Sequence, residues 1–288
     1  MPDAADWACW HASAMSRVAP SRPPLSPPAV RAAVLAGSAL YTSVEVVDRT
    51  GSTNADLIAA ARGGSAAGSV LVAEEQTAGR GRLDRSWHSQ PGAALTFSVL
   101  LRPAVVPPGG RGWLPLLTGV AVASAIAAQT GVAASLKWPN DVLDGGAEGA
   151  GKLAGILAEQ AGDAIVVGVG LNVSASRDEL PSDRATSLWL AGADSPDRQA
   201  ILVAILREFE RWYLSWTGGV APGDATACGL RAAYLSACST VGHDVRVELP
   251  GGGALTGRAT GVDAAGCLLV SAADGVHAVS AGDVVHVR

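Results

Sequence analysis

Three arginines, Arg80, Arg82 and Arg85, lie close together in the segment EEQTAGRGRLDRSW, residues 74–87. The glycines on either side of Arg80 let backbone N–H groups approach an anion closely, and arginine side chains bind phosphate oxygens through paired hydrogen bonds. The segment lacks the Gly-Lys-Ser/Thr ending of a P-loop and the third glycine of a dinucleotide fingerprint. An anion-binding loop, an exposed charged loop and an RNA-binding element remain open, although the absence of a repeated Arg-Gly tract disfavours the last.

Two further segments place polar residues where an apolar pattern is interrupted. GSTN, residues 51–54, begins a helix, and its side chains either only cap that helix or also face a polar ligand at its N-terminus. KWPNDV, residues 137–142, is either a capped turn or a phosphate site. In the second case Lys137 neutralises phosphates, while Asn140 and Asp141 position metal-bound phosphate or polar substrate groups.

A fourth segment, GKLAGILAE, residues 151–159, reads as a core strand that opens on a lysine. Lys152 either extends to solvent from the strand end or points into a site, where it contacts a carboxyl or phosphoryl group. Gly155 would allow a flat ligand to lie against the strand. GVGLN, residues 168–172, adds a second patch of small residues that ends at Asn172.

The sequence between these segments predicts strands and helices of an α+β domain. VEVVD, GSVLVAEEQ, AALTFSVLLRP and DAIVVGVGLNV have the composition and alternation of strands. Helices are predicted over residues 27–37 and 195–216, the latter with Ser195 as its cap. The uncharged stretch over residues 113–136 is long enough for a membrane span. Its Ala, Gly, Ser and Thr content favours a buried helix over residues 115–130 that ends at Gly131.

The pattern changes near residue 240. Residues 241–288 contain five short Val-rich runs separated by Gly- or Asp-containing turns, which predicts a small β-barrel. We therefore expect a disordered or poorly ordered Pro/Ala-rich segment over residues 1–40, a main domain over residues 41–238 and the barrel over residues 239–288. Met15 is an alternative translation start.

Composition limits the function classes. The formal net charge is −5, with 49% apolar and 16% charged residues, which disfavours a dedicated nucleic-acid binder. The 4 cysteines form no Cys-x-x-Cys pair and the 5 histidines have no ligand spacing, so reduced thiols in a cytoplasmic protein are expected rather than a zinc site. No signal-peptide pattern is present at the N-terminus.

The motifs GSTN, EEQTAGRGRLDRSW, KWPNDV, GKLAGILAE and GVGLNV, in this order, resemble the biotin–protein ligase family, that is, the biotin–[acetyl-CoA-carboxylase] ligases. Each motif alone has weak or moderate specificity, but the ordered set is highly specific. The resemblance implies a mixed-sheet catalytic domain like that of class II aminoacyl-tRNA synthetases. It also implies that the C-terminal barrel is the family's small SH3-like domain.

The resemblance implies a two-step reaction. Biotin's carboxylate attacks the α-phosphate of ATP to give biotinyl-5'-AMP and pyrophosphate, with Mg²⁺ assisting. A lysine of a biotin carboxyl carrier domain then attacks the mixed anhydride and releases AMP. No covalent enzyme intermediate is required, which agrees with the lack of any Cys/His or Ser/His pairing in the motifs.

The resemblance also implies roles for individual residues. Catalytic roles fall to Arg80, Lys152, Lys137 and Asp141. Biotin is expected to contact Ser52, Thr53, Asn54, Gln76, Arg80, Gly81, Arg82, Lys152 and Gly155. ATP or the adenylate is expected to contact Arg80, Arg82, Trp87, Asn140, Lys152 and Asn172. Magnesium is expected to bind through the ATP phosphates, with Asp141 as a candidate ligand.

Two other functions remain open. A lipoate or octanoate ligase shares the fold, although the arginine segment and KWPNDV favour biotin. A non-catalytic module that binds biotinyl-adenylate and controls a partner is also compatible with the motifs. We expect no DNA binding, because residues 1–40 are too short for a winged helix-turn-helix domain and the net charge is negative. We also expect no association with membranes.

Overall fold

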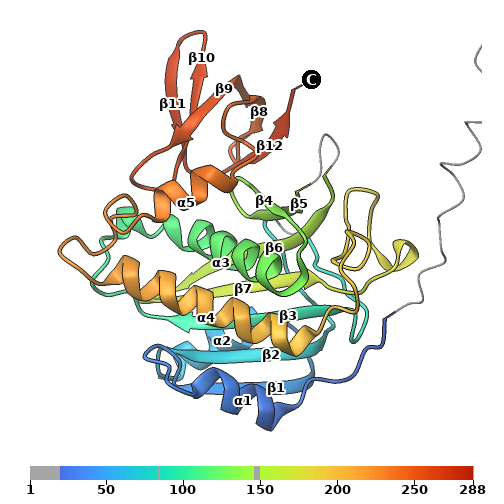
Figure 1. Ribbon diagram of the computed structural model, residues 1–288. Coiled ribbons are helices and arrows are strands. Elements are labelled where there is room, and N and C mark those ends of the chain that lie inside the picture. Colours follow the sequence, from blue (N-terminus) through green and yellow to red (C-terminus); the bar gives the residue numbers. More distant parts are fainter. Residues whose placement is uncertain (1–19, 84, 146–149, 288) are drawn as a thin grey trace, which may run out of the picture.

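The computed structural model (Figure 1) describes residues 20–83, 85–145 and 150–287. These residues form a seven-stranded sheet covered by helices and a separate five-stranded sheet at the C-terminal end. Residues 1–19 of the segment expected to be poorly ordered lie outside the described residues. Residues 20–40 contradict that expectation, because they contain helix α1 (Pro27–Leu35), which buries Val30 and Val34.

The large sheet is mixed. Its strand order is β1-β2-β3-β7-β6-β5-β4, in which β1 and β2 are parallel and all other neighbours are antiparallel. The central strands β3 and β7 are buried along their whole length, which explains their nearly continuous apolar sequences. The strands are β1 (Ser43–Thr50), β2 (Ser69–Gln76), β3 (Ala94–Leu101), β4 (Ala134–Lys137), β5 (Asp141–Asp144), β6 (Lys152–Ala161) and β7 (Ala164–Asn172).

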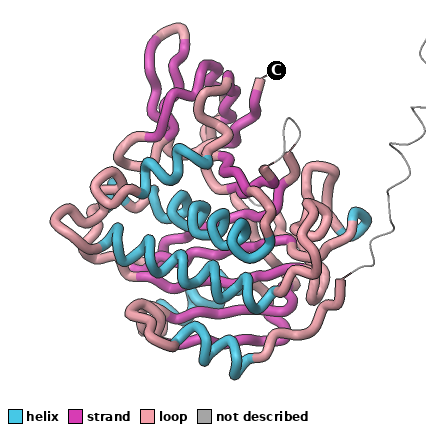
Figure 2. Tube along the Cα trace, viewed as in Figure 1, coloured by secondary structure: helices cyan, strands magenta, loops and turns pink. Residues whose placement is uncertain are grey.

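The helices divide between the two faces of this sheet (Figures 1 and 2). Helices α1, α3 (Trp113–Thr130) and α4 (Arg198–Thr217) pack on one face and enclose the main core. Among the described helices, only α2 (Thr53–Arg62) packs on the opposite face, over a small cluster that includes Leu57, Leu71 and Val166. The face under α2 is therefore only partly covered, which leaves room for a site beside the helix.

Helix α3 accounts for the uncharged stretch. Most of its residues are buried against the sheet and α4, and it ends at Gly131, whose φ of 70° is left-handed. The stretch Pro108–Thr130, which begins with the short 3₁₀ helix η1 (Pro108–Gly110), has the length and hydropathy of a membrane span. Because it packs inside the protein, its apolar character is explained as a core helix, as predicted.

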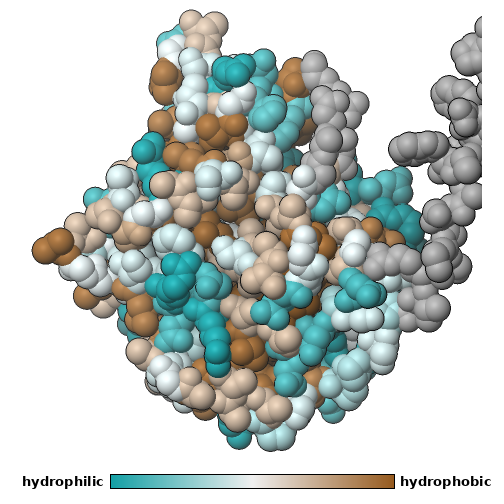
Figure 3. Space-filling view, in the orientation of Figure 1, coloured by the Kyte–Doolittle hydropathy of each residue, from teal (hydrophilic) through white to brown (hydrophobic). Residues whose placement is uncertain are grey.

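Helix α4 begins later than predicted. Its cap is Asp197, whose carboxylate accepts hydrogen bonds from the backbone N–H groups of Gln199 and Ala200. Ser195 lies upstream with a φ of 46° and does not cap the helix. A carboxylate at an N-cap also faces the positive end of the helix dipole. Hydrophilic surface covers part of the α4 region in Figure 3, where Arg207 and Arg211 are exposed.

The C-terminal sheet joins the main core through a compact junction. Its strands are antiparallel in the order β11-β10-β9-β8-β12, and α5 (Leu230–Ala237) precedes them. The indole N–H groups of Trp113 and Trp138 donate to the carbonyls of Ala264 and Gly266 in the turn between β9 and β10, at 3.0 and 3.1 Å. The strands are β8 (Asp244–Glu248), β9 (Ala254–Val262), β10 (Leu268–Ala272), β11 (Gly275–Val279) and β12 (Asp283–His286).

Candidate active site

Glycines form a flat floor on the α2 face of β6 and β7. Gly155 and Gly170 are paired across the two strands, and Gly168 is two residues along β7 on the same face. A Cβ atom at Gly170 would lie 2.3 Å from Cε2 of Trp87, and one at Gly168 would lie 2.1 Å from Oδ1 of Asn54. Any larger residue would therefore collide with the side chains above, and we call Gly155, Gly168 and Gly170 the glycine floor.

The Trp87 indole lies on the glycine floor. Besides its contact with Gly170, its Cζ3 atom is 3.4 Å from the Cβ position of Gly155, and Lys152 Nζ is 3.2 Å from that position. The buried indole Nε1 has no hydrogen-bond partner among the described residues. The Trp87 ring and Lys152 therefore both border Gly155, and the predicted contact of Trp87 with the adenylate stays a prediction.

Residues of GSTN and Gln76 form one polar wall of the site. Oε1 of Gln76 accepts hydrogen bonds from the backbone N–H and the hydroxyl of Thr53, at 2.8 and 3.1 Å. Ser52 is the N-cap of α2 and accepts from the N–H of Ala55 at 3.5 Å. Ser98, which the motif reasoning missed, lies 2.7 Å from the Thr53 hydroxyl oxygen. These contacts fix the orientation of three residues that were predicted to bind biotin.

The side chain of Asn54 is fully engaged with the protein. Its Nδ2 donates to the carbonyl of Leu157 at 3.1 Å and to Glu159 Oε2 at 2.8 Å, while its Oδ1 lies 2.6 Å from Ser98 Oγ. The amide is 4% exposed. The side chain of Asn54 therefore supports the wall and the floor, and its predicted contact with biotin stays a prediction.

Each arginine of residues 79–87 has a partner on another element. Arg80 pairs with Glu159 at 3.1 Å, and Arg85 forms an ion pair with Asp283. Arg82 donates to Oδ1 of Asn140 at 3.1 Å and to the carbonyl of Gly282 at 3.4 Å. These partners relieve the mutual repulsion expected of three neighbouring cations.

The backbone of the same loop closes on itself. The N–H of Gly81 donates to the carbonyl of Arg85 at 2.6 Å, and the N–H of Trp87 donates to the carbonyl of Gly79 at 2.9 Å. A Cβ atom at Gly79 would lie 2.5 Å from the Trp87 carbonyl oxygen, so the turn requires glycine there. The arginine loop is thus a defined turn that carries Trp87 onto the floor.

Among the described residues, cations surround the carboxylate of Asp141 beside the floor. Lys152 Nζ lies 2.6 Å from Oδ1 of Asp141. Burial lowers the pKa of Lys137 and of Arg82, and Asp141 opposes that shift in both. Arg85 and Arg184 add to the positive potential at Lys137. With Asp141 already paired with Lys152, this cluster has surplus positive charge that favours an anion such as a triphosphate.

Two asparagines predicted to contact the nucleotide differ in their position. Asn140 lies at the cluster, where Oδ1 accepts from Arg82 and Nδ2 donates to the carbonyl of Ile156 at 3.0 Å. Asn172 is 5% exposed, and its Nδ2 donates to the carbonyl of Thr186 at 2.9 Å. Asn172 therefore anchors the chain that follows β7, and its predicted contact with ATP stays a prediction.

The side chains of the site suit a magnesium ion only when the ion enters bound to the phosphates of ATP. Within residues 20–83, 85–145 and 150–287, no group of three or more His, Cys, Asp and Glu side chains is placed to hold a metal. Asp141 is the carboxylate nearest the cation cluster. Magnesium commonly keeps several waters and binds through one or two carboxylates plus substrate phosphates, and a single Asp141 suits that arrangement.

The fold and the site define a ligase-type catalytic domain, and comparison with known proteins specifies it. Residues 46–174 match the Biotin/lipoate A/B protein ligase family, and residues 240–287 match the Biotin protein ligase C terminal domain. The chain is 43% identical over 275 residues to the biotin–[acetyl-CoA-carboxylase] ligase of Mycobacterium tuberculosis, with 93% of this chain and 97% of the relative covered. The chain belongs to the biotin–protein ligase family, which confirms the resemblance read from the motifs.

A second relative and a solved structure agree. The biotin–[acetyl-CoA-carboxylase] ligase of Paracoccus denitrificans is 32% identical, with 82% of this chain and 97% of the relative covered. The biotin protein ligase from Aquifex aeolicus in complex with biotin and ATP has a TM-score of 0.70 and 30% identity, with 86% of this chain and 100% of that chain covered. The predicted α+β class with a mixed sheet and a small C-terminal β-domain is confirmed.

Proposed function

We propose that this chain joins biotin to ATP to form biotinyl-5'-AMP and then transfers biotin to a lysine of a biotin carboxyl carrier domain. One observation carries the proposal: a flat glycine floor ends at Lys152, where the surplus of positive charge begins. A flat neutral ring system suits the floor, and its carboxylate and a triphosphate suit the cations. The relatives named above act as biotin ligases, and a neighbour binds biotin and ATP.

The residues address the main obstacle of the first step, which is the meeting of two anions. In the proposal Lys152 lies between the biotin carboxylate and the α-phosphate and stabilises negative charge as the new oxygen–phosphorus bond forms and pyrophosphate leaves. Preorganised cations of this kind commonly supply a dominant part of catalysis. Lys137, Arg82 and Asn140 hold the remaining phosphate charge, and Mg²⁺ bound with the phosphates supplies further neutralisation.

Binding of biotin is assigned to the polar wall and the floor. The hydroxyls of Ser52 and Thr53 and the amide of Gln76 face the ureido group, and Thr53 and Gln76 are already oriented by their mutual hydrogen bonds. The backbone of Arg80 and Gly81 closes over the ligand. The Trp87 ring lies on the floor and has to move off it to admit the ligand. In the proposal the ring then covers the apolar part of biotin and excludes water from the mixed anhydride, which would otherwise hydrolyse.

The second step needs a carrier lysine rather than a group of this chain. The deprotonated amine of that lysine attacks the acyl carbon, the carbon–oxygen bond to phosphate breaks, and AMP leaves. The partner is a biotin carboxyl carrier domain of an acyl-CoA carboxylase. We assign the chain to the cytoplasm, because its proposed substrates, ATP and the carrier domain, are cytoplasmic.

Pyrophosphate exchange into ATP tests the first step. With magnesium present, we expect exchange that depends on biotin, and lipoate and octanoate serve as matched ligands. Exchange stimulated by lipoate or octanoate but not by biotin would replace the biotin assignment with a lipoate-type ligase.

A streptavidin blot tests the second step. We expect biotin on a carrier domain incubated with the chain, biotin and MgATP, and no label on a carrier whose acceptor lysine is changed to arginine. Tight biotin binding together with an unlabelled wild-type carrier would instead indicate a non-catalytic regulator.

A further inference from the structure

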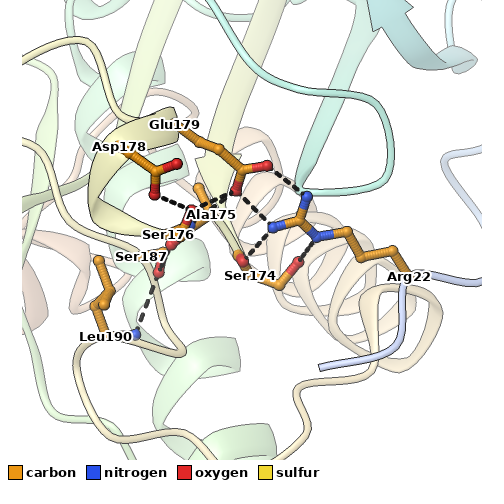
Figure 4. Close-up of polar contacts among 8 residues, drawn as sticks. All are labelled: Arg22, Ser174, Ala175, Ser176, Asp178, Glu179, Ser187 and Leu190. Atoms are coloured by element: carbon orange, nitrogen blue, oxygen red, sulfur yellow. Dashed lines mark hydrogen bonds and ion pairs between the residues drawn. The ribbon is translucent and has the colours of Figure 1, made fainter. Parts of the chain in front are cut away.

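The segment that precedes α1 is clamped to the loop that follows β7 (Figure 4). Arg22 donates from Nη1 and Nη2 to both carboxylate oxygens of Glu179, at 2.8 and 2.6 Å. The same guanidinium donates from Nε to Ser174 Oγ at 3.1 Å and from Nη2 to the Ser174 carbonyl at 2.7 Å. A two-pronged pair of this kind fixes direction as well as distance.

Glu179 in turn organises the loop over residues 174–187, which we call the β7 loop. Its Oε2 accepts from the backbone N–H of Ser176 at 2.9 Å and caps the short 3₁₀ helix η2 (Arg177–Glu179). The Arg22 guanidinium lowers the pKa of Glu179 to about 2, so the carboxylate is ionised at neutral pH. Arg22 therefore binds the Glu179 carboxylate, and that carboxylate in turn fixes the backbone at the start of the β7 loop.

The far end of the β7 loop holds the backbone of Lys152. The N–H of Lys152 donates to the carbonyl of Arg184 at 2.7 Å, and the N–H of Thr186 donates to the carbonyl of Lys152 at 2.9 Å. Arg177 joins the two ends, because its guanidinium donates to the carbonyls of Asp183 and Ala185. Hydrogen bonds joined by short stretches of the β7 loop therefore connect Arg22 to Lys152.

A second clamp holds the segment around Arg22 in place independently. Arg198, which is 6% exposed, donates from Nη2 to the carbonyl of Pro23 at 2.7 Å and from Nη1 to Glu74 Oε2 at 2.7 Å. Glu74 Oε1 accepts from the N–H of Leu25 at 2.6 Å. The Arg198–Glu74 pair therefore holds residues 23–25 on the sheet. The side chain of Arg22 pairs separately with Glu179 of the β7 loop.

We propose that Arg22 is a positioning residue for adenylation, which clamps Glu179 so that the β7 loop holds Lys152 at the junction of the biotin and phosphate sites. The inference rests on the proposed function, because the effect is expressed through Lys152. Arg22 lies outside every motif from which the function was derived, and its segment comes from outside the matched region over residues 46–174.

The test compares Arg22→Ala, Glu179→Gln and the reversed pair Arg22→Glu with Glu179→Arg in biotin-dependent pyrophosphate exchange. Both single variants are expected to lower kcat/KM for MgATP about tenfold, since small displacements of a positioned group cost large factors in rate. The reversed pair is expected to recover part of the loss. Glu179→Gln keeps an oxygen for Ser176 and leaves the second clamp intact, so it serves if Arg22→Ala fails to fold.

Arg207→Ala is the matched control, because Arg207 donates to the carbonyl of Ala33 in α1 and has no contact with the β7 loop among the described residues. It is expected to keep wild-type kinetics. Direct biotin binding in the absence of ATP is expected to change less than twofold in every variant. Wild-type kcat/KM in folded Arg22→Ala or Glu179→Gln would overturn the inference while leaving the function intact. Absence of exchange in the wild-type chain would instead count against the function itself.

Discussion

At the scale of single residues, Lys152 lies where the glycine floor meets the cation cluster. Its side chain contacts Asp141 and borders the glycine floor, while its backbone is held by Arg184 and Thr186. The sequence left open whether this lysine extended to solvent. In the fold, Lys152 Nζ lies 2.6 Å from Asp141 Oδ1 and 3.2 Å from the Cβ position of Gly155, so the side chain lies beside the floor.

Replacing Lys152 by alanine is expected to slow adenylation about 10²- to 10³-fold, the range for losing one preorganised charge-stabilising group. Arg80→Ala is expected to fall in the same range, because Arg80 is expected to leave Glu159 and bind the anions. Single-turnover formation of biotinyl-AMP measures both. Near-normal rates in both variants would remove these role assignments.

Gly170→Ala tests the floor. The new Cβ would lie 2.3 Å from the Trp87 ring, so the indole must move off the floor. Overpacking costs about 1–3 kcal/mol, and we expect biotin affinity to fall about ten- to hundredfold in titration calorimetry. Gly251→Ala is the control, because nothing lies within 4 Å of a Cβ there. Unchanged biotin affinity in Gly170→Ala would show that the ligand does not use this floor.

At the scale of elements, strands and helices followed from the sequence more reliably than their connections. The alternating and apolar runs predicted β1 to β3, β6 and β7, and the burial of α3 followed from its uncharged sequence. The cap of α4 was misplaced because Ser195 and Asp197 both have cap-forming side chains, and only the path of the chain selects between them. Local residue types cannot show that path.

The long-range polar contacts of the site were not predictable. Ser98 and Glu159 lie within strands that read as ordinary core or edge sequence, and they reach Asn54 only through sheet pairing and the packing of α2. Arg22 and Glu179 are 157 residues apart in the chain. By contrast Ser52, Thr53, Gln76 and Lys152 could be proposed from the sequence because they belong to compact motifs.

The Arg22–Glu179 pair predicts a specific pH dependence. The pKa of Glu179 falls from 4.5 to about 2 on folding, chiefly through hydrogen bonding to Arg22. A depressed carboxyl pKa adds stability above the unfolded value, and that contribution is lost as pH falls toward the folded value. Urea unfolding should therefore show wild type more stable than Glu179→Gln above about pH 4.5, with the difference vanishing near pH 2. A difference independent of pH would contradict this origin.

At the scale of the whole molecule, the C-terminal sheet touches the arginine loop directly. Arg85 pairs with Asp283 and Arg82 donates to the carbonyl of Gly282, both at the start of β12. A cavity of about 400 Å³ lies at the same junction and shares Arg82 and Asn140 with the site. The small sheet therefore helps to set the position of the loop that covers the floor.

Asp283→Ala is expected to raise the KM values for biotin and MgATP several-fold, because the loop loses a partner on the second sheet. Stability should change by less than about 1 kcal/mol, since Arg85 is largely exposed and such pairs contribute little. Asp244→Ala, which removes an exposed carboxylate on β8 facing Arg258, is the control for steady-state kinetics and thermal unfolding. Equal KM values in both variants would mean that the sheet does not act through Asp283.

The placement of Lys137 and Lys152 has a practical consequence for chemical labelling. They are the only two lysines in the sequence, and both belong to the cation cluster beside the floor. Burial lowers the pKa of Lys137, so its amine is deprotonated, and hence nucleophilic, at lower pH than an ordinary lysine. Acylating reagents that spare arginine will thus report occupancy of the active site by substrates, read by peptide mapping that separates the two lysines from the N-terminal amine.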